Sequence, residues 1–180
     1  MKKILLVLLL VSIVFVSGCS SGIPASGKAV AKGDANTGLK VGDKAPDFAV
    51  TTTDGITIKL SDLSNQKKPA VVYFFATWCP FCHEELASLK TVYPEYSDKV
   101  EFVAIDLDIA ENQERVARYK LKNAYVGGFT QGDRKVLSDY NAIRTTTKYA
   151  IDKDGIIQYT SSGELTKQEW KTLFTGLIAY

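Results

Sequence analysis

The sequence lacks an excess of charge of either sign. Lys and Arg together number 22 and Asp and Glu 20, and residues 1–18 contain Lys2 and Lys3 but no acidic residue. Without those two leader lysines, 20 basic residues face 20 acidic ones. A chain without a basic surplus has no electrostatic footprint for a nucleic acid. We therefore expect no nucleic-acid partner.

Cysteine, histidine and methionine are scarce, which limits the metal sites that the chain can build. The three cysteines are Cys19, Cys79 and Cys82, the one histidine is His83, and the one methionine is Met1. A structural zinc site needs four ligands, usually two cysteine pairs, and the sequence has no second pair. Thiolates suit Cu(I), but no His or Met is placed as a distal ligand. We therefore predict that the chain holds no metal. The alternative hypothesis is a module that binds Cu(I) or an iron–sulfur cluster through its thiolates.

The first 40 residues divide into a leader and a linker. The basic "MKK" and the apolar "ILLVLLLVSIVFV" form a secretory signal pattern, too short for a stable membrane span. The following "VSGC" resembles a lipobox, which implies cleavage after residues 1–18 and lipid attachment to Cys19; a retained signal anchor is the alternative. Residues 19–40 are rich in Gly, Ser, Ala and Lys and predict a flexible tether. We expect residues 41–180 to form one domain outside the cytoplasm, anchored by lipid to the cell membrane.

Strand-like and helix-like segments alternate along residues 41–180, which predicts an α/β domain with a mixed sheet covered on both faces. Asp54-Gly55 lies between two short strand-like runs and predicts a hairpin. Thr166 and Glu169 form a capping-box pattern at the start of the last helix. The expected strands are 69–77, 99–108, 147–152 and 156–161, and the expected helices are 80–93, 110–121, 133–140 and 166–180.

The pair Cys79 and Cys82 has the spacing of a redox couple. Cys79 follows a buried strand, and Pro80 suits the first position of a helix, so Cys79 is predicted at the N-cap. Free backbone N–H groups there lower a thiol pKa and favour the thiolate. Cys82 lies on the same helical face, one turn away, where it can close a disulfide. A disulfide that closes so small a loop adds little stability to a domain, so the pattern favours redox chemistry.

Three segments carry a resemblance to a known family: "KAPDFAVTTTDGITIKLSDL", "VVYFFATWCPFCHEEL" and "YAIDKDGII". They resemble the thioredoxin superfamily and, within it, the extracytoplasmic TlpA/ResA-type thiol–disulfide oxidoreductases. The resemblance covers residues 41–180 and implies a thioredoxin-like fold with an added N-terminal β-hairpin. It also implies that Cys79 attacks, that Cys82 resolves the mixed disulfide, and that Trp78 is the flanking aromatic residue.

The same resemblance implies a membrane-tethered enzyme that exchanges electrons with exported proteins. Reduction of selected substrates, such as apocytochrome cysteines, is favoured over general oxidation, and a membrane electron donor is expected. Pro80 and Phe81 between the cysteines match neither the reducing Gly-Pro nor the oxidising Pro-His pattern, so the direction of electron flow stays open. The disulfide itself is the redox group, with no other cofactor expected, and no feature demands a dimer.

Glu85 matches the acidic residue that the family carries beneath its active site. A raised pKa from partial burial would let it relay a proton to or from Cys82, and the alternative is an exposed helix residue beside Glu84. Tyr73 occupies the position of the buried Asp of thioredoxin, so that relay is predicted to be absent. We expect His83 to be an exposed helix residue.

Thr146 departs from the family pattern. An alignment on Tyr140 and on Ile151-Asp152 puts Thr146 where the family has a cis-proline beside the disulfide. A cis bond before Thr costs about 2.5–4 kcal/mol, so we predict a strained or remodelled loop. Thr146 could then offer its hydroxyl to a bound peptide.

A thiol peroxidase is the remaining alternative, because the early hairpin also resembles peroxiredoxins. Those enzymes carry Thr or Ser three residues before the reactive cysteine. Ala76 stands at that position here, which disfavours peroxidase chemistry.

Overall fold

The computed structural model describes residues 36–180. The predicted signal, the lipidation site Cys19 and most of the tether lie outside the described residues. Residues 36–40, which the sequence assigns to the tether, hydrogen-bond with the start of the domain. Lys44 N–H donates to the Asn36 carbonyl over 3.1 Å, and Gly38 N–H donates to the Lys44 carbonyl over 3.0 Å.

A five-stranded mixed sheet forms the centre of the domain, in the order β5-β4-β3-β6-β7. Strand β3 pairs parallel with β4 and antiparallel with β6. This confirms the predicted α/β class with a central mixed sheet. The strands of the sheet are β3 (Ala70–Phe75), β4 (Glu101–Asp106), β5 (Gly128–Thr130), β6 (Lys148–Ile151) and β7 (Ile157–Ser161).

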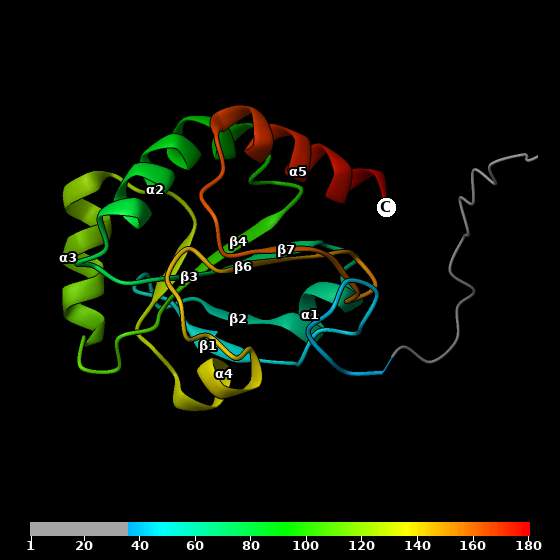
Figure 1. The fold of residues 1–180 in the computed structure, drawn as a ribbon, viewed down its shortest axis with the longest axis horizontal. Coiled ribbons are helices and arrows are strands. Elements are labelled where there is room, and N and C mark those ends of the chain that lie inside the picture. The colour runs from blue at the N-terminus through cyan, green and yellow to red at the C-terminus, as the bar shows by residue number, and fades with distance from the viewer. Residues whose placement is uncertain (1–35) are drawn as a thin grey trace, which may run out of the picture. The chain divides into compact units, whose positions relative to one another are not determined.

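Strand β3 is buried along its whole length because both faces of the sheet are covered. Successive side chains of a strand point to opposite faces, so Tyr73 and Phe75 join one apolar cluster and Val72 and Phe74 the other. The first cluster packs under α2, α3 and α5, and the second packs against α1, α4 and the hairpin (Figure 1). The continuous apolar run of the sequence therefore builds two cores.

The helices begin where the sequence supplies caps. Cys79 is the N-cap of α2 and is followed by Pro80, and Thr166 with Glu169 completes the predicted capping box of α5. The helices are α1 (Leu60–Asn65), α2 (Pro80–Val92), α3 (Gln113–Asn123), α4 (Arg134–Asp139) and α5 (Lys167–Ala179), with a 3-10 turn at Tyr93–Glu95. Within residues 36–180, none of these helices is long and apolar enough to cross a membrane.

The predicted N-terminal hairpin is present as β1 (Ala49–Thr51) and β2 (Thr57–Lys59), paired antiparallel. Gly55 has a φ of +78° in the turn, a left-handed conformation that glycine adopts without steric cost. Two elements were not predicted. Helix α1 follows β2 directly, and the segment around Gly127-Gly128, which lies outside the expected strands and helices, contributes the edge strand β5.

Candidate active site

The two cysteines lie at the junction of β3 and α2, as the sequence predicts. Cys79 has extended backbone at the N-cap, and its Sγ accepts a hydrogen bond from Cys82 N–H over 3.1 Å. The two residues form a disulfide with their Cα atoms 5.3 Å apart. Both are buried, Cys79 at 3% exposure and Cys82 at 0%. A partner sulfur must therefore reach Cys79, the less covered of the two.

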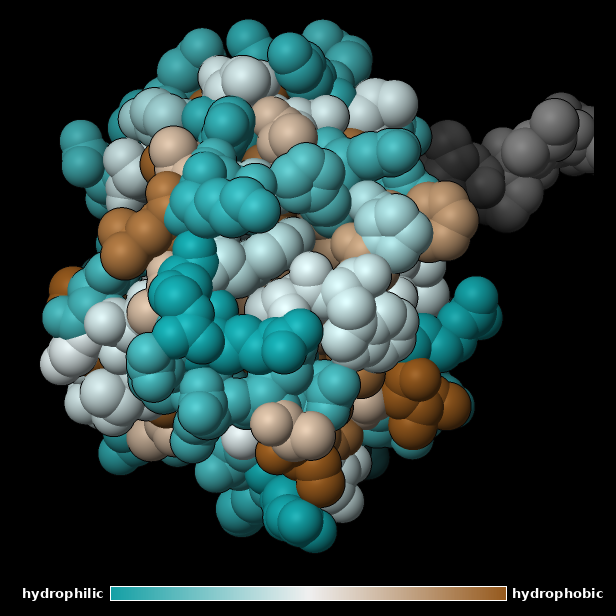
Figure 2. All heavy atoms as spheres, turned by 90° about the vertical axis from the view of Figure 1, so that its left-hand side faces the viewer, coloured by the Kyte–Doolittle hydropathy of each residue, from teal (hydrophilic) through white to brown (hydrophobic). Residues whose placement is uncertain are grey.

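Exposed aromatic residues surround the disulfide. Trp78 and Phe81 are 59% and 58% exposed, although both are large apolar side chains. They line a groove of about 420 Å³ whose lining also includes Thr146 and Glu164. Trp78 is held in place because its Nε1–H donates to the Asp108 carboxylate over 2.9 Å. The face of the domain on which α3 lies is mostly hydrophilic, with separate hydrophobic spots (Figure 2).

The loop before β6 is remodelled around Thr146, as predicted. No cis peptide bond occurs within residues 36–180, and Thr146 has a φ of +61°. This left-handed conformation is a genuine outlier for a β-branched residue. The buried Thr146 hydroxyl donates to the carbonyl oxygens of Thr145 and Ser162, at 2.6 and 2.8 Å. Its proton is thus used inside the loop in this conformation, and the prediction that Thr146 offers its hydroxyl to a bound peptide stays a prediction.

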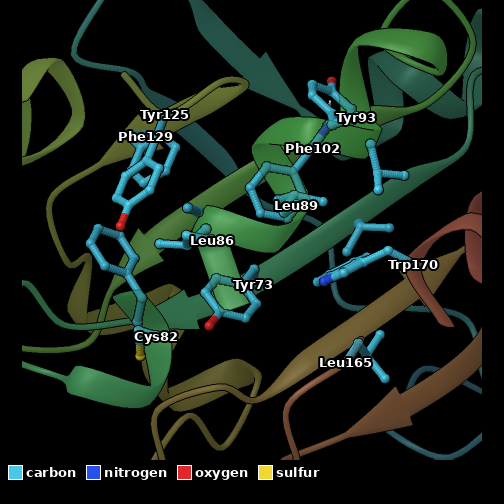
Figure 3. Close-up of a cluster of buried hydrophobic side chains, with 14 of the residues drawn as sticks. Tyr73, Cys82, Leu86, Leu89, Tyr93, Phe102, Tyr125, Phe129, Leu165 and Trp170 are labelled. Atoms are coloured by element: carbon cyan, nitrogen blue, oxygen red, sulfur yellow. Dashed lines mark hydrogen bonds between the residues drawn. The ribbon is translucent and has the colours of Figure 1, made fainter. Parts of the chain in front are cut away.

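Glu85 is buried at 2% exposure, so the alternative of an exposed helix residue was wrong. Its carboxylate accepts hydrogen bonds from the Tyr73 hydroxyl over 2.9 Å and from Leu165 N–H over 2.8 Å. The ammonium group of Lys148 lies 2.9 Å from it in an ion pair. Burial raises the pKa of Glu85, and Lys148 opposes that rise most strongly. Figure 3 shows the apolar cluster to which Cys82, Tyr73 and Trp170 belong, with Tyr73 between Cys82 on one side and Trp170 on the other.

Tyr73 and Lys148 were not recognised as site residues from the sequence. The position of Tyr73 was interpreted as the loss of a proton relay, but its hydroxyl donates to Glu85 and thus contributes to a network beneath the disulfide. Lys148 is fully buried at the start of β6. A signal was available, because a lysine in an otherwise apolar strand needs a buried anion as partner.

A second carboxyl cluster supports the segment before Cys79. Glu111 accepts hydrogen bonds from the Thr77 hydroxyl and from Thr77 N–H, the latter over 3.1 Å. Arg115 Nε lies 2.5 Å from Glu111. Burial, followed by the neighbouring Glu111, raises the pKa of Asp106 to about 8. Asp106 is therefore largely protonated at neutral pH and can stay buried beside an ionised Glu111.

His83 is exposed on α2, as expected, and the Tyr125 hydroxyl lies 2.6 Å from its Nδ1. Within residues 36–180, no three side chains of His, Cys, Asp or Glu converge to hold a metal ion. The chemistry that this geometry supports is thiol exchange at Cys79, with Cys82 as the second sulfur.

A thioredoxin-like sheet with a Cys-x-x-Cys disulfide at the start of α2 defines a thiol–disulfide oxidoreductase. Residues 41–160 match the model of the AhpC/TSA family, to which the chain belongs. The chain is 32% identical over 133 residues to Thioredoxin-like protein YneN of Bacillus subtilis (strain 168), covering 73% of this chain and 77% of the relative. It is 34% identical over 134 residues to Thiol-disulfide oxidoreductase ResA of Bacillus cereus, covering 73% of this chain and 75% of the relative.

The fold comparison agrees with the sequence comparison. A thioredoxin family thiol:disulfide interchange protein from Chlorobium tepidum TLS has a TM-score of 0.66 at 22% identity. The match covers 80% of this chain and 99% of that structure. The thioredoxin-like, ResA-like resemblance inferred from the motifs is confirmed, as is the oxidoreductase activity it implied.

Proposed function

We propose that the protein is a membrane-tethered reductant of disulfides in exported proteins. The observation that carries the proposal is the Cys79–Cys82 disulfide at the start of α2, beside an open groove with exposed aromatic walls. A helix N-terminus favours the Cys79 thiolate. Together with the ResA relatives, this placement supports exchange with a protein substrate that docks an extended cysteine-containing segment in the groove.

The reaction proceeds by two exchanges. The thiolate of reduced Cys79 attacks one sulfur of the substrate disulfide, forms a mixed disulfide and releases the other substrate sulfur as a thiolate. Cys82 then loses its proton and attacks the Sγ of Cys79, which restores the internal disulfide and releases the second substrate thiolate. Both leaving thiolates take up protons from solvent. The substrate gains two electrons and the enzyme dithiol loses two.

Glu85 is proposed as the group that takes the proton from Cys82 in the second exchange. Residues three apart on a helix are neighbours on its surface, which places Glu85 beside Cys82 on α2. Cys82 is fully buried, so water has little direct access to its proton. A buried carboxylate next to it supplies the acceptor.

The location is proposed from the start of the chain. Residues 1–18 have the pattern of a signal, "VSGC" resembles a lipobox, and residues 19–35, which precede the part that hydrogen-bonds with the domain, supply the length for a tether. Cys19 would carry the lipid. Regeneration of the dithiol would then require an electron donor that crosses the membrane, and apocytochrome cysteines are one substrate class that this location allows.

The test is to trap the mixed disulfide. In cells that make Cys82→Ser, resolution is blocked, so we expect Cys79 to accumulate disulfide-linked adducts whose partners carry export signals. The matched control Cys79→Ser should trap none, because it lacks the attacking sulfur. Adducts confined to cytoplasmic proteins, or equal adducts in both variants, would contradict the proposal. A Cys19→Ser variant should leave the membrane fraction; retention there would contradict lipid anchoring at Cys19.

A further inference from the structure

A fully buried ion pair lies beneath the redox helix. The side chains of Lys148 and Glu85 are both 0% exposed, and their charged atoms are 2.9 Å apart. Lys148 also donates to the Gly163 carbonyl over 2.5 Å. Its ammonium lies 5.5 Å from the centroid of the Tyr73 ring and 5.9 Å from that of Trp170. This cation is therefore held by one carboxylate, one carbonyl and two aromatic rings.

Stability alone does not explain the pair. Lysine is among the residues least often fully buried, and replacing a buried ion pair by apolar residues of similar volume is often neutral or stabilising. The surrounding cluster is rich in aromatic and aliphatic side chains that would accept such a replacement. Glu85, the anion of the pair, lies about one helical turn after Cys82 on α2. The proposed reaction needs a proton acceptor near Cys82.

We propose that Lys148 is a positioning residue of the redox site, which holds Glu85 ionised and oriented as the proton acceptor for Cys82. This inference rests on the proposed function and deepens it. Lys148 does not touch the sulfurs in the proposal. It acts through Glu85, and its own proton stays in place during the reaction.

The ionisation state follows from competing effects on Glu85. Burial is the largest effect and raises the pKa of Glu85, whereas Lys148 lowers it. Burial likewise lowers the pKa of Lys148, and Glu85 opposes this. Without the lysine, the charge that opposes the effect of burial is lost, so the pKa of Glu85 would rise further and less of the carboxyl would be ionised to accept a proton. The titratable and charged groups that face the pair are Tyr73 from β3, Cys82 from α2, Glu164 from the segment before α5, and Glu169 from the first turn of α5.

The orientation follows from the hydrogen bonds. One carboxylate oxygen of Glu85 contacts Lys148 and Leu165 N–H, and the other accepts from the Tyr73 hydroxyl. Lys148 is tied in turn to Gly163, which also lines the groove. The carboxylate is thus fixed by contacts from β3, from β6 and from the segment before α5. The lysine links it to the wall of the groove in which the substrate would dock.

The proton balance is simple. In the mixed disulfide, the Cys82 thiol transfers its proton to the Glu85 carboxylate, and the resulting thiolate attacks the Sγ of Cys79. The bond between Cys79 and the substrate sulfur breaks, and the substrate leaves as a thiolate that is protonated by solvent. Glu85 returns its proton to solvent and pairs again with Lys148.

The test separates the two exchanges in a single turnover. The full chain with Cys19→Ser, kept in detergent, has only two thiols. After reduction it is mixed with an aromatic disulfide whose released thiolate is coloured. Attack by Cys79 releases one thiolate in the first phase, and resolution by Cys82 releases the second. The pH dependence of the second phase is compared for five proteins that all carry Cys19→Ser. They are the protein with Lys148 and Glu85 unchanged, Lys148→Met, Lys148→Arg, Glu85→Gln and the double variant Lys148→Met/Glu85→Gln.

We expect Lys148→Met to slow the second phase at neutral pH by about tenfold for each unit by which the Glu85 pKa rises above the pH of the assay, and to move its pH profile upward. Lys148→Arg should restore most of the rate because it keeps the charge. In a Glu85→Gln background, Lys148→Met should cause no further slowing. The exposed Lys167 provides the matched control, and Lys167→Met should leave both phases unchanged.

The outcomes distinguish the inference from the proposed function. If the protein with Lys148 releases two thiolates but Lys148→Met shows the same pH profile, the role of Lys148 is wrong and the exchange chemistry stands. Slowing by Lys148→Met that persists in the Glu85→Gln background also overturns it, because the lysine then does not act through Glu85. If the protein with Lys148 releases only one thiolate, the proposed function fails first. The double variant buries no lone charge, so its comparison with Glu85→Gln tests the inference even if Lys148→Met folds poorly.

Discussion

Two buried carboxyl clusters flank the Cys-x-x-Cys motif. Burying the charge of a carboxylate is costly, and the two clusters offset that cost in different ways. After the second cysteine, Lys148 lies 2.9 Å from the Glu85 carboxylate and opposes the rise in the Glu85 pKa that burial causes. In the cluster that supports the chain before the motif, Asp106 keeps its proton because burial and Glu111 raise its pKa to about 8. In our proposal, the first cluster thus holds an anion ready to accept the proton of Cys82. The second holds a neutral carboxyl group and a carboxylate that supports Thr77.

The difference teaches what each cluster can do. An ion pair in a dry interior keeps a base available at neutral pH, whereas a carboxyl that has already bound its proton cannot accept another. The cluster at Asp106 is therefore a support for the chain before Cys79, and the cluster at Glu85 is the one suited to proton transfer. Each of the following changes breaks or sharpens this contrast.

The largest effect is expected from removing the cation of the first cluster. Breaking a fully buried pair by removing one partner typically costs about 3–5 kcal/mol, and both side chains here are 0% exposed. Lys148→Met should therefore lower the free energy of unfolding, measured with denaturant, by that order. Adding Glu85→Gln should recover part of the loss. Equal stabilities of Lys148→Met and its parent would show that the two charges are not paired in the interior.

The proton that Asp106 holds in the folded state should make the free energy of unfolding depend on pH. Folding raises the pKa of Asp106 from 3.8 to about 8, so between those pH values the folded chain binds a proton that the unfolded chain lacks. The free energy of unfolding should then fall as pH rises through this window, by at most about 1.4 kcal/mol per pH unit. In Asp106→Asn this contribution should vanish. Parallel stability–pH curves for the two proteins would mean that Asp106 is ionised in the folded state.

The smallest effect concerns the loop before β6, whose residues line the groove beside the disulfide. Thr146→Ala removes the hydroxyl that bonds the Ser162 carbonyl but keeps the left-handed backbone. Thr146→Gly removes the same hydroxyl and relieves the steric cost, which is about 1–2 kcal/mol for a residue with a Cβ. The glycine variant should therefore unfold at a higher denaturant concentration than the alanine variant. The reverse order would indicate that the φ of +61° is not kept in solution.

Much of this architecture could be predicted because local signals agreed with the global fold. The apolar run 69–77 indicated a strand buried on both faces, Pro80 placed Cys79 at an N-cap, and Thr166 with Glu169 marked the start of α5. Each of these signals lies within a few residues of the structure it specifies. The redox pair could be predicted for the same reason, because its chemistry depends on spacing along a single helix.

The missed features depend on contacts between distant segments. Gly128 begins β5, although glycine is depleted in strands; a Cβ there would lie 2.8 Å from the Ile58 side chain, so packing against the hairpin explains the glycine. Lys148 meets Glu85 only after β6 has packed against β3 beneath α2. The spacing of Lys148 and Glu85 along the chain does not indicate that the two side chains are in contact. A buried position for a lysine indicates that an anion is needed and leaves its identity open.

The most direct test of the central claim is the reduction potential of the Cys79–Cys82 couple, measured by equilibration with dithiothreitol or glutathione buffers. The account predicts a two-electron couple near thioredoxin's roughly −270 mV, as expected of a reductant supplied with electrons from across a membrane. A value near roughly −120 mV would instead identify an oxidant that installs disulfides, and would contradict the proposed direction of electron flow.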